Sequence, residues 1–122
     1  MKSFPFIIIL SIVILGFSAH GQQVVKCLDK SACLKELQQD KFLIIDVRTP
    51  QEFSKGHLEN ALNYNYYEAD FKEKINALDR KQKVLVYCEV GGRSADAVKQ
   101  FKSLGFDYII EIKGGYRNWK NT

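Results

Sequence analysis

The sequence predicts an α/β fold in which a parallel sheet of about five strands is flanked by helices on both faces. Two observations lead to this class. Short apolar runs that are typical of buried strands recur along the chain, and polar segments with helical periodicity fill the gaps between them. No linker, repeat or low-complexity tract follows Gln22. We therefore expect one domain over residues 22–122, with ligands bound at the carboxyl ends of its strands.

Three apolar runs predict strands most directly, namely Phe42–Val47, Val84–Tyr87 and Tyr108–Ile112. Their β-branched and aromatic residues form the short, continuous pattern of strands that are buried on both faces. Two further stretches, Gln23–Lys26 and Ala61–Asn63, are the candidates that bring the total to five.

Helices are predicted between these strands. Thr49 is a suitable N-cap with Pro50 at the first helical position, and Gly105 is a suitable stop at the end of another helix. The predicted helices are Ser31–Gln39, a short helix over Pro50–Phe53, Tyr66–Leu78, Ser94–Leu104 and a last turn at Tyr116–Lys120.

The first 21 residues differ from the rest of the chain. Lys2 precedes an almost wholly apolar run, Phe4–Phe17, and Ala19 and Gly21 put small residues at positions −3 and −1 of a cut before Gln22. This is the layout of a secretory signal peptide. The apolar run is shorter than the about 20 residues that span a bilayer. We therefore expect residues 1–21 to be removed, which leaves no stable membrane anchor.

A cleaved signal peptide gives the mature domain a secreted or periplasmic location. The alternative is a membrane anchor formed by the uncleaved segment. A lipoprotein is disfavoured because the charged Lys26 precedes Cys27, where lipid attachment needs a small residue. The formal charge of +4 is small and unclustered, so no nucleic-acid partner is expected. The mature chain keeps one histidine, His57, which rules out a His-rich metal site, and no metal or cofactor is expected.

The segment that carries the chemistry is the loop from Cys88 to Ser94, between a predicted strand and a predicted helix. Gly91 and Gly92 allow the backbone to curl so that successive N–H groups point inward. The following helix directs its positive end at the same place, and a helix N-terminus favours the thiolate form of an adjacent cysteine. Cys88 is therefore the predicted nucleophile, and it needs no histidine base.

At this point the sequence resembles a known family. Four motifs look like those of a single-domain rhodanese, in the order and spacing of that family: Asp46–Phe53, Gly56–Ala61, Cys88–Ser94, and Gly114–Tyr116 followed by Trp119. The resemblance covers about Asp40–Trp119. It departs from the family at Glu59-Asn60, where Pro-Gly is usual, and at Tyr116, where the aromatic residue is often Trp.

The resemblance implies the rhodanese-like α/β fold and sulfurtransferase chemistry for residues 22–122. Cys88 would attack the outer sulfur of a small anionic donor such as thiosulfate and become a persulfide, from which cyanide, a thiol or a protein thiol takes the sulfur. Arg93 would attract the donor. The backbone N–H groups of the loop would bind the substrate sulfur, and they belong to Glu89, Val90, Gly91, Gly92, Arg93 and Ser94. A non-catalytic binding module or a sulfur-carrier partner protein is the alternative.

The length of the loop separates the nearest rival activities. Four residues lie between Cys88 and Arg93, whereas rhodanese-related phosphatases and arsenate reductases, which resemble this scaffold, have five. The shorter loop favours sulfur over a tetrahedral oxyanion. Glu89 makes the mouth of the loop less positive and is expected to weaken affinity for thiosulfate, which leaves room for a different donor or a protein partner.

Two other features allow more than one interpretation. Arg48 either pairs with Glu52, four residues on, or lies at the rim of the active-site pocket. Cys27 and Cys33 are expected to meet oxidising conditions, and a disulfide between them is geometrically allowed if Ser31 caps the helix and leaves Cys27 outside it. Unbridged thiols and a redox or metal pair are the alternatives.

Overall fold

The computed structural model describes residues 2–5, 8, 11 and 21–122. Most of the predicted signal peptide, residues 1–21, lies outside these residues. Within the described part of the chain, no helix is both long enough and apolar enough to cross a bilayer.

Five parallel strands form one sheet in the order β1-β5-β4-β2-β3. The predicted fold class is confirmed. All four residues of β4, the central strand, are buried, as expected for a strand covered on both faces. The strands are β1 (Val24–Leu28), β2 (Leu43–Asp46), β3 (Leu62–Asn63), β4 (Val84–Tyr87) and β5 (Tyr108–Ile112).

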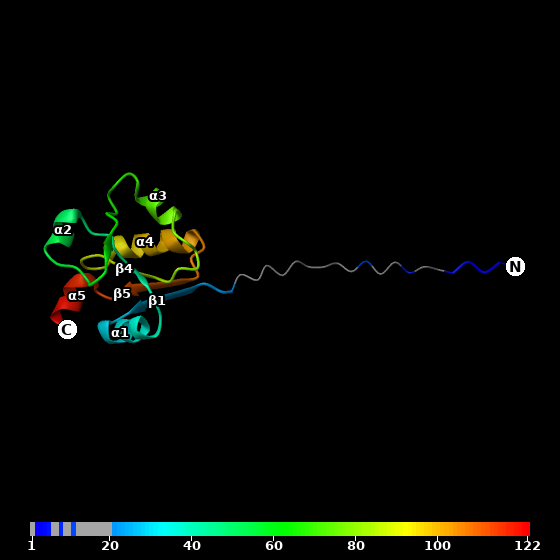
Figure 1. Ribbon diagram of the computed structural model, residues 1–122, viewed down its shortest axis with the longest axis horizontal. Helices are drawn as coiled ribbons and strands as arrows, with labels where there is room; N and C mark the ends of the chain where they lie inside the picture. Colours follow the sequence, from blue (N-terminus) through cyan, green and yellow to red (C-terminus); the bar gives the residue numbers. More distant parts are fainter. Residues whose placement is uncertain (1, 6–7, 9–10, 12–20) are drawn as a thin grey trace.

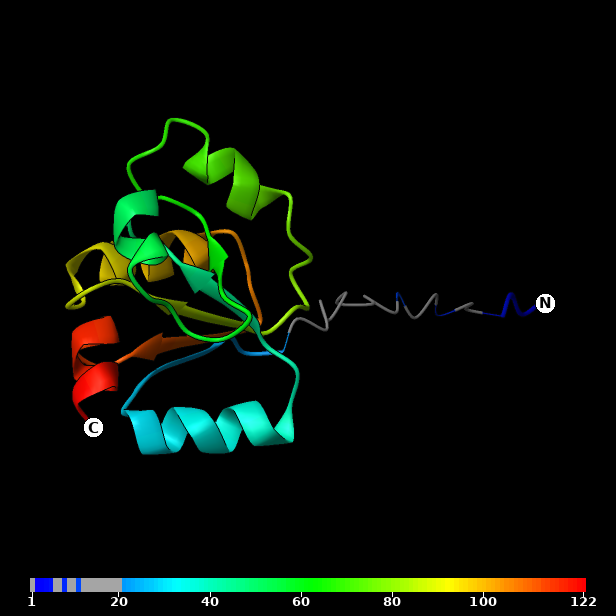
Figure 2. The same cartoon turned by 60° about the vertical axis from the view of Figure 1, so that its left-hand side comes forward.

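The helices cover the sheet on both faces, so the domain has two apolar cores (Figures 1 and 2). On one face α3 and α4 pack on the sheet, and on the other α1 and α5 do so. The helices are α1 (Lys30–Gln39), α2 (Pro50–Ser54), α3 (Phe71–Asn76), α4 (Gly92–Ser103) and α5 (Gly115–Asn121).

Helix α4 begins at Gly92 rather than at the predicted Ser94. The predicted starts of α1 and α3 are also wrong, each for a physical reason. Helix α1 is capped by Asp29 rather than Ser31, because the Asp29 carboxylate accepts the N–H of Ala32 at 2.9 Å. The chain before α3 is not a continuous helix, because residues 66–70 form turns and a bend. The N–H groups of Tyr64 and Tyr66 bond to carbonyls at the end of β2, so residues 64–66 continue along the sheet edge.

The predicted cap of α2 is confirmed. Thr49 Oγ1 accepts the N–H of Glu52 at 3.3 Å, and the Glu52 carboxylate accepts the N–H of Thr49 at 3.2 Å. This reciprocal capping box fixes Glu52 at the start of a short helix beside the carboxyl ends of the strands.

Candidate active site

Cys88 directly follows the central strand β4, and its sulfur lies under the start of α4. The N–H of Gly91 donates to Cys88 Sγ at 3.0 Å. Gly91 has φ of 126°, a conformation that favours glycine, and this turns the loop back over the sulfur. Cys88 is only 1% exposed, so the thiol is enclosed by its own loop.

Ser94, in the first turn of α4, is the second polar group at the sulfur. Cys88 Sγ lies 3.3 Å from Ser94 Oγ, which also lies 2.6 Å from the Glu111 carboxylate and 3.2 Å from the Gly91 carbonyl. Glu111 is a site residue that the sequence analysis missed. Its one sequence signal is that it is the acidic residue inside the otherwise apolar and aromatic run of β5.

The start of α5 supports the loop from behind. The N–H groups of Tyr116 and Arg117 donate to the carbonyls of Cys88 and Glu89, at 2.8 and 3.0 Å. Gly115 has φ of 67°, and a Cβ atom at this position would lie 2.5 Å from the Glu89 carbonyl oxygen. Glycine is therefore required at position 115, because a side chain there would prevent the close approach of the α5 backbone to the backbone of Glu89.

Arg93 is paired with a carboxylate rather than free at the mouth of the loop. Its guanidinium donates to both carboxylate oxygens of Glu52, at 2.7 and 2.9 Å. This bidentate contact, together with the cap at Thr49, holds the pKa of Glu52 at about 2. Arg93 was expected to attract an anionic donor. Its positive charge is partly offset by the carboxylate of Glu52.

Arg48 is 2% exposed and holds several elements together. It donates to the buried Asp46 carboxylate from Nε at 3.1 Å and from Nη2 at 2.7 Å, and its Nη1 bonds Glu89 at 3.0 Å. Its guanidinium also lies 4.4 Å from the ring centre of Tyr116. Burial alone would lower the pKa of Arg48, but the bonds and charge of Asp46 outweigh burial and raise the pKa.

The interpretation that pairs Arg48 with Glu52 is wrong, because Glu52 is engaged by Arg93. Arg48 borders a pocket beside the loop, but Cys88 does not line this pocket. A place for Arg48 at the rim of the active-site pocket stays a prediction. The pocket beside the loop has a volume of about 200 Å³ and is lined by Arg48, Glu52, Lys55, Glu89, Tyr116 and Lys120. Both acidic and basic side chains line it, so its charge is mixed.

Two apolar side chains stand exposed near the loop. Val90, at the tip of the loop, is 54% exposed, and Tyr67 is 68% exposed with its ring centre 5.7 Å from the Arg93 guanidinium. Tyr66, by contrast, packs on the core and donates its hydroxyl to Asp96 at 2.7 Å. His57 stacks on the ring of Phe53, consistent with an ordering role in its loop.

All three cysteines are free thiols, so of the alternatives for Cys27 and Cys33 the structure has the unbridged one and not the disulfide. Lys26 reaches Glu36 of α1 at 2.9 Å, and successive side chains of a strand point to opposite faces. Cys27 therefore points away from the face where Cys33 is buried under α1. Burial raises the pKa of Cys33 to about 12, so it remains a protonated thiol.

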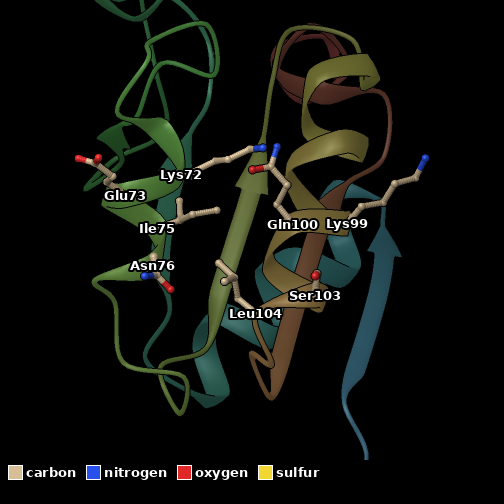
Figure 3. A pocket seen from close by; sticks show the side chains of 8 residues that line it. All are labelled: Lys72, Glu73, Ile75, Asn76, Lys99, Gln100, Ser103 and Leu104. Carbon is tan, nitrogen blue, oxygen red and sulfur yellow. The ribbon is translucent and has the colours of Figure 1, made fainter.

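A larger cavity of about 480 Å³ lies between α3 and α4, away from the cysteine loop (Figure 3). Lys72 and Ile75 of α3 face Gln100 of α4 across it. None of its lining residues belongs to the loop from Cys88 to Ser94. Within the described residues, no cluster of three or more His, Cys, Asp and Glu side chains is placed to hold a metal ion.

A cysteine at the end of the central strand, enclosed by a loop that opens a helix, defines a class of α/β proteins with a cysteine-centred anion cradle. The model of the rhodanese-like domain family matches residues 30–122 of the chain. The chain therefore belongs to the rhodanese-like domain family.

Named relatives share this domain. The chloroplastic thiosulfate sulfurtransferase 16 of Arabidopsis thaliana is 35% identical over 85 residues, covering 62% of this chain and 71% of that protein. The thiosulfate sulfurtransferase GlpE of Pseudomonas aeruginosa is 29% identical over 90 residues, covering 73% and 79%. The crystal structure of a rhodanese-related protein from Thermoplasma volcanium matches with a TM-score of 0.69 at 28% identity, covering 79% and 91%. The chain spans about half the length of several other curated relatives.

Proposed function

We propose that the chain is a sulfurtransferase that carries a sulfane sulfur as a persulfide on Cys88. The observation that carries this proposal is the N–H of Gly91 at 3.0 Å from Sγ, at the positive end of the 12-residue helix α4. Both the N–H group and the helix end stabilise negative charge on sulfur. They favour the attacking thiolate, and then the anionic outer sulfur of the persulfide.

The proposed reaction has two halves. The Cys88 thiolate attacks the outer sulfur of a donor such as thiosulfate, so an S–S bond forms to Cys88. The bond to the inner sulfur breaks, and sulfite leaves with its electron pair. A thiophilic acceptor, either cyanide or a thiol, then attacks the outer sulfur and releases the Cys88 thiolate.

The charges at the mouth bear on the choice of substrates. Arg48 and Arg93 are both paired with carboxylates, which lowers the attraction for a dianion such as thiosulfate. Val90 and Tyr67 offer exposed apolar contacts beside the loop. These features support a protein thiol as one of the exchange partners, because apolar contacts add affinity that a small anion does not use.

The test is formation of thiocyanate from thiosulfate and cyanide by the purified protein. We expect steady turnover with the kinetic pattern of two separate half-reactions. Cys88→Ser should have no activity, and Cys27→Ser, which removes the exposed thiol, should keep it. A protein that accepts one sulfur on Cys88 but shows no turnover with cyanide or small thiols would instead support the sulfur-carrier alternative.

We also propose that residues 1–21 are a signal peptide and that the mature protein is secreted or periplasmic. The support is the sequence layout of a charge, an apolar run and small residues before Gln22. Expression of the whole chain in a bacterium and N-terminal sequencing of the exported protein should give a chain that begins at Gln22. Full-length protein in the membrane fraction would instead establish the anchored alternative.

A further inference from the structure

The cavity between α3 and α4 is separate from the cysteine loop and has the size of a small-molecule site. Its volume is about 480 Å³. Pockets that bind small molecules have volumes of about 300–1,000 Å³ and are lined mainly by apolar side chains with a few polar groups. The fully buried Ile75 of α3 and the partly buried Leu104 at the end of α4 supply apolar surface to this cavity. A ligand that fits here therefore needs an apolar body.

Gln100 of α4 adds a polar atom that lacks a partner. Its side-chain oxygen Oε1 is shielded from solvent and accepts no hydrogen bond from the described residues. Nearly all buried carbonyl oxygens in proteins are hydrogen-bonded, because an unpaired one is destabilising. The last torsion of a glutamine side chain is soft, so the amide can turn Oε1 towards the cavity without breaking a hydrogen bond of this atom. A ligand with an N–H or O–H group therefore supplies the donor that the protein does not.

Lys72 of α3 brings a positive charge to the same cavity. Its ammonium group extends towards Gln100 across the cavity, whereas the Glu73 carboxylate points away from α4 (Figure 3). Among the ion pairs of the described residues, Lys72 has no partner, and the nearby Asp70 pairs with Lys74 at 3.6 Å. An anionic group on the ligand therefore complements Lys72 in charge.

We propose that this cavity binds a small organic acid that has a heteroaromatic ring with an N–H donor. Such a ring carries the donor on an otherwise apolar body. The carboxylate pairs with Lys72, the N–H group bonds Oε1 of Gln100, and the ring packs against Ile75 and Leu104. The charge of Lys72 favours an acid over a neutral amide of the same shape, and the unpaired Oε1 favours a ring with a donor over a ring without one.

The proposed site lies at the opposite end of α4 from the cysteine loop. Gln100 lies in the last turn of α4, with Leu104 directly after it, whereas Ser94 of the loop lies in the first turn. The acid would join α3 to the end of α4 and would not contact Cys88. The proposal therefore goes beyond sulfur transfer and does not depend on it.

The probe for this site is indole-3-acetate, which carries a ring N–H group and a carboxylate on an apolar double ring. NMR titration of the purified, isotope-labelled protein measures the affinity and shows which backbone N–H groups respond. We expect saturable shift changes at residues 72–76 and 99–104, with a dissociation constant of about 1 mM or lower. Naphthalene-1-acetate, which lacks the N–H group, should bind about fivefold more weakly. Indole-3-acetamide, which lacks the charge, should bind about threefold more weakly.

Substitutions assign each preference to one side chain. Gln100→Leu removes the unpaired oxygen and should bind indole-3-acetate and naphthalene-1-acetate with equal affinity. Lys72→Gln should no longer distinguish indole-3-acetate from its amide. Lys74→Gln is the matched control on the same helix and should keep both preferences, because Lys74 does not line the cavity. Comparing two ligands on each variant isolates the contribution of a single contact.

Three results would overturn the proposal. The first is a titration without saturable shift changes, and the second is a set of changes confined to residues outside α3 and α4. The third is a preference for the N–H group that survives in Gln100→Leu. Neither Lys72 nor Gln100 is a fully buried residue, so both variants should fold, and thermal unfolding checks this. The titration contains no sulfur donor, so its result is independent of whether Cys88 transfers sulfur.

Discussion

The guanidinium of Arg93 and the carboxylate of Glu52 form a two-bond ion pair, at 2.7 and 2.9 Å, that joins α4 to α2 beside the cysteine loop. The positive charge of Arg93 is therefore neutralised by a carboxylate of the protein itself. The charge of a second arginine, Arg48, is neutralised in the same way by Asp46 and Glu89. The mouth of the cysteine loop therefore carries little surplus positive charge.

Glu52→Gln should improve the use of thiosulfate. Glutamine still accepts the capping bond from Thr49, but it no longer neutralises Arg93. A gain of about 1 kcal/mol from one released charge near the surface corresponds to about a fivefold lower KM, with kcat little changed. Steady-state kinetics with thiosulfate and cyanide measures both. Glu73→Gln is the matched control, and an unchanged or higher KM in Glu52→Gln would contradict the account.

The same pair should make stability depend on pH in a defined window. The pKa of Glu52 is lowered to about 2, so its contribution is fully present above its ordinary value near 4.5 and is lost as pH falls towards 2. Because the carboxylate is 31% exposed, we expect only about 1 kcal/mol. Urea unfolding of wild type and Glu52→Gln measures the difference, which should be constant above about pH 4.5 and shrink below it. A difference that does not change with pH would refute this assignment.

Asp46→Asn should be strongly destabilising. Asp46 is fully buried and neutralises Arg48, so the substitution leaves a buried cation with one remaining carboxylate partner, Glu89. We expect a loss of about 3 kcal/mol in the free energy of unfolding. Asp40→Asn is the matched control, because Asp40 pairs with Lys83 at the surface and should cost under about 1 kcal/mol. Equal losses of unfolding free energy in the two variants would show that the buried pair of Asp46 and Arg48 contributes no more to stability than a surface pair.

Gly115→Ala should disturb the active loop more than its backbone strain alone explains. Gly105 and Gly115 both have positive φ, at 87° and 67°, so alanine carries a strain of about 1 kcal/mol at each. A Cβ atom at Gly105 meets nothing within 4 Å, whereas at Gly115 it meets the carbonyl of Glu89 at 2.5 Å. Thermal unfolding and Cys88 alkylation should therefore change more in Gly115→Ala than in Gly105→Ala. Indistinguishable variants would show that α5 does not support the loop.

The fold class and the position of the cysteine loop between a strand and a helix were predictable because their signals are local. Apolar runs such as Val84–Tyr87 mark buried strands, and a cysteine followed by two glycines and a helix marks an anion cradle. The contacts that tune the site were not predictable in the same way. Arg93 lies 41 residues from Glu52, and Ser94 lies 17 residues from Glu111, so only the folded sheet brings them together.

The start of α3 shows a second limit of the sequence. Tyr66 and the residues after it have a helical pattern, yet the N–H of Tyr66 bonds to the carbonyl of Val47 at 3.0 Å. Pairing with the sheet edge therefore outweighs the local preference for a helix. The cap at Asp29 has a different origin, since both Asp29 and Ser31 have suitable side chains and the pattern alone does not choose between them.

The central claim is that Cys88 carries the transferred sulfur, and intact-mass measurement after thiosulfate treatment tests it most directly. We predict a gain of about 32 Da, located on the peptide that contains Cys88, lost on addition of cyanide and absent in Cys88→Ser. No gain from thiosulfate or any other sulfur donor, or a gain that persists in Cys88→Ser, would contradict the account.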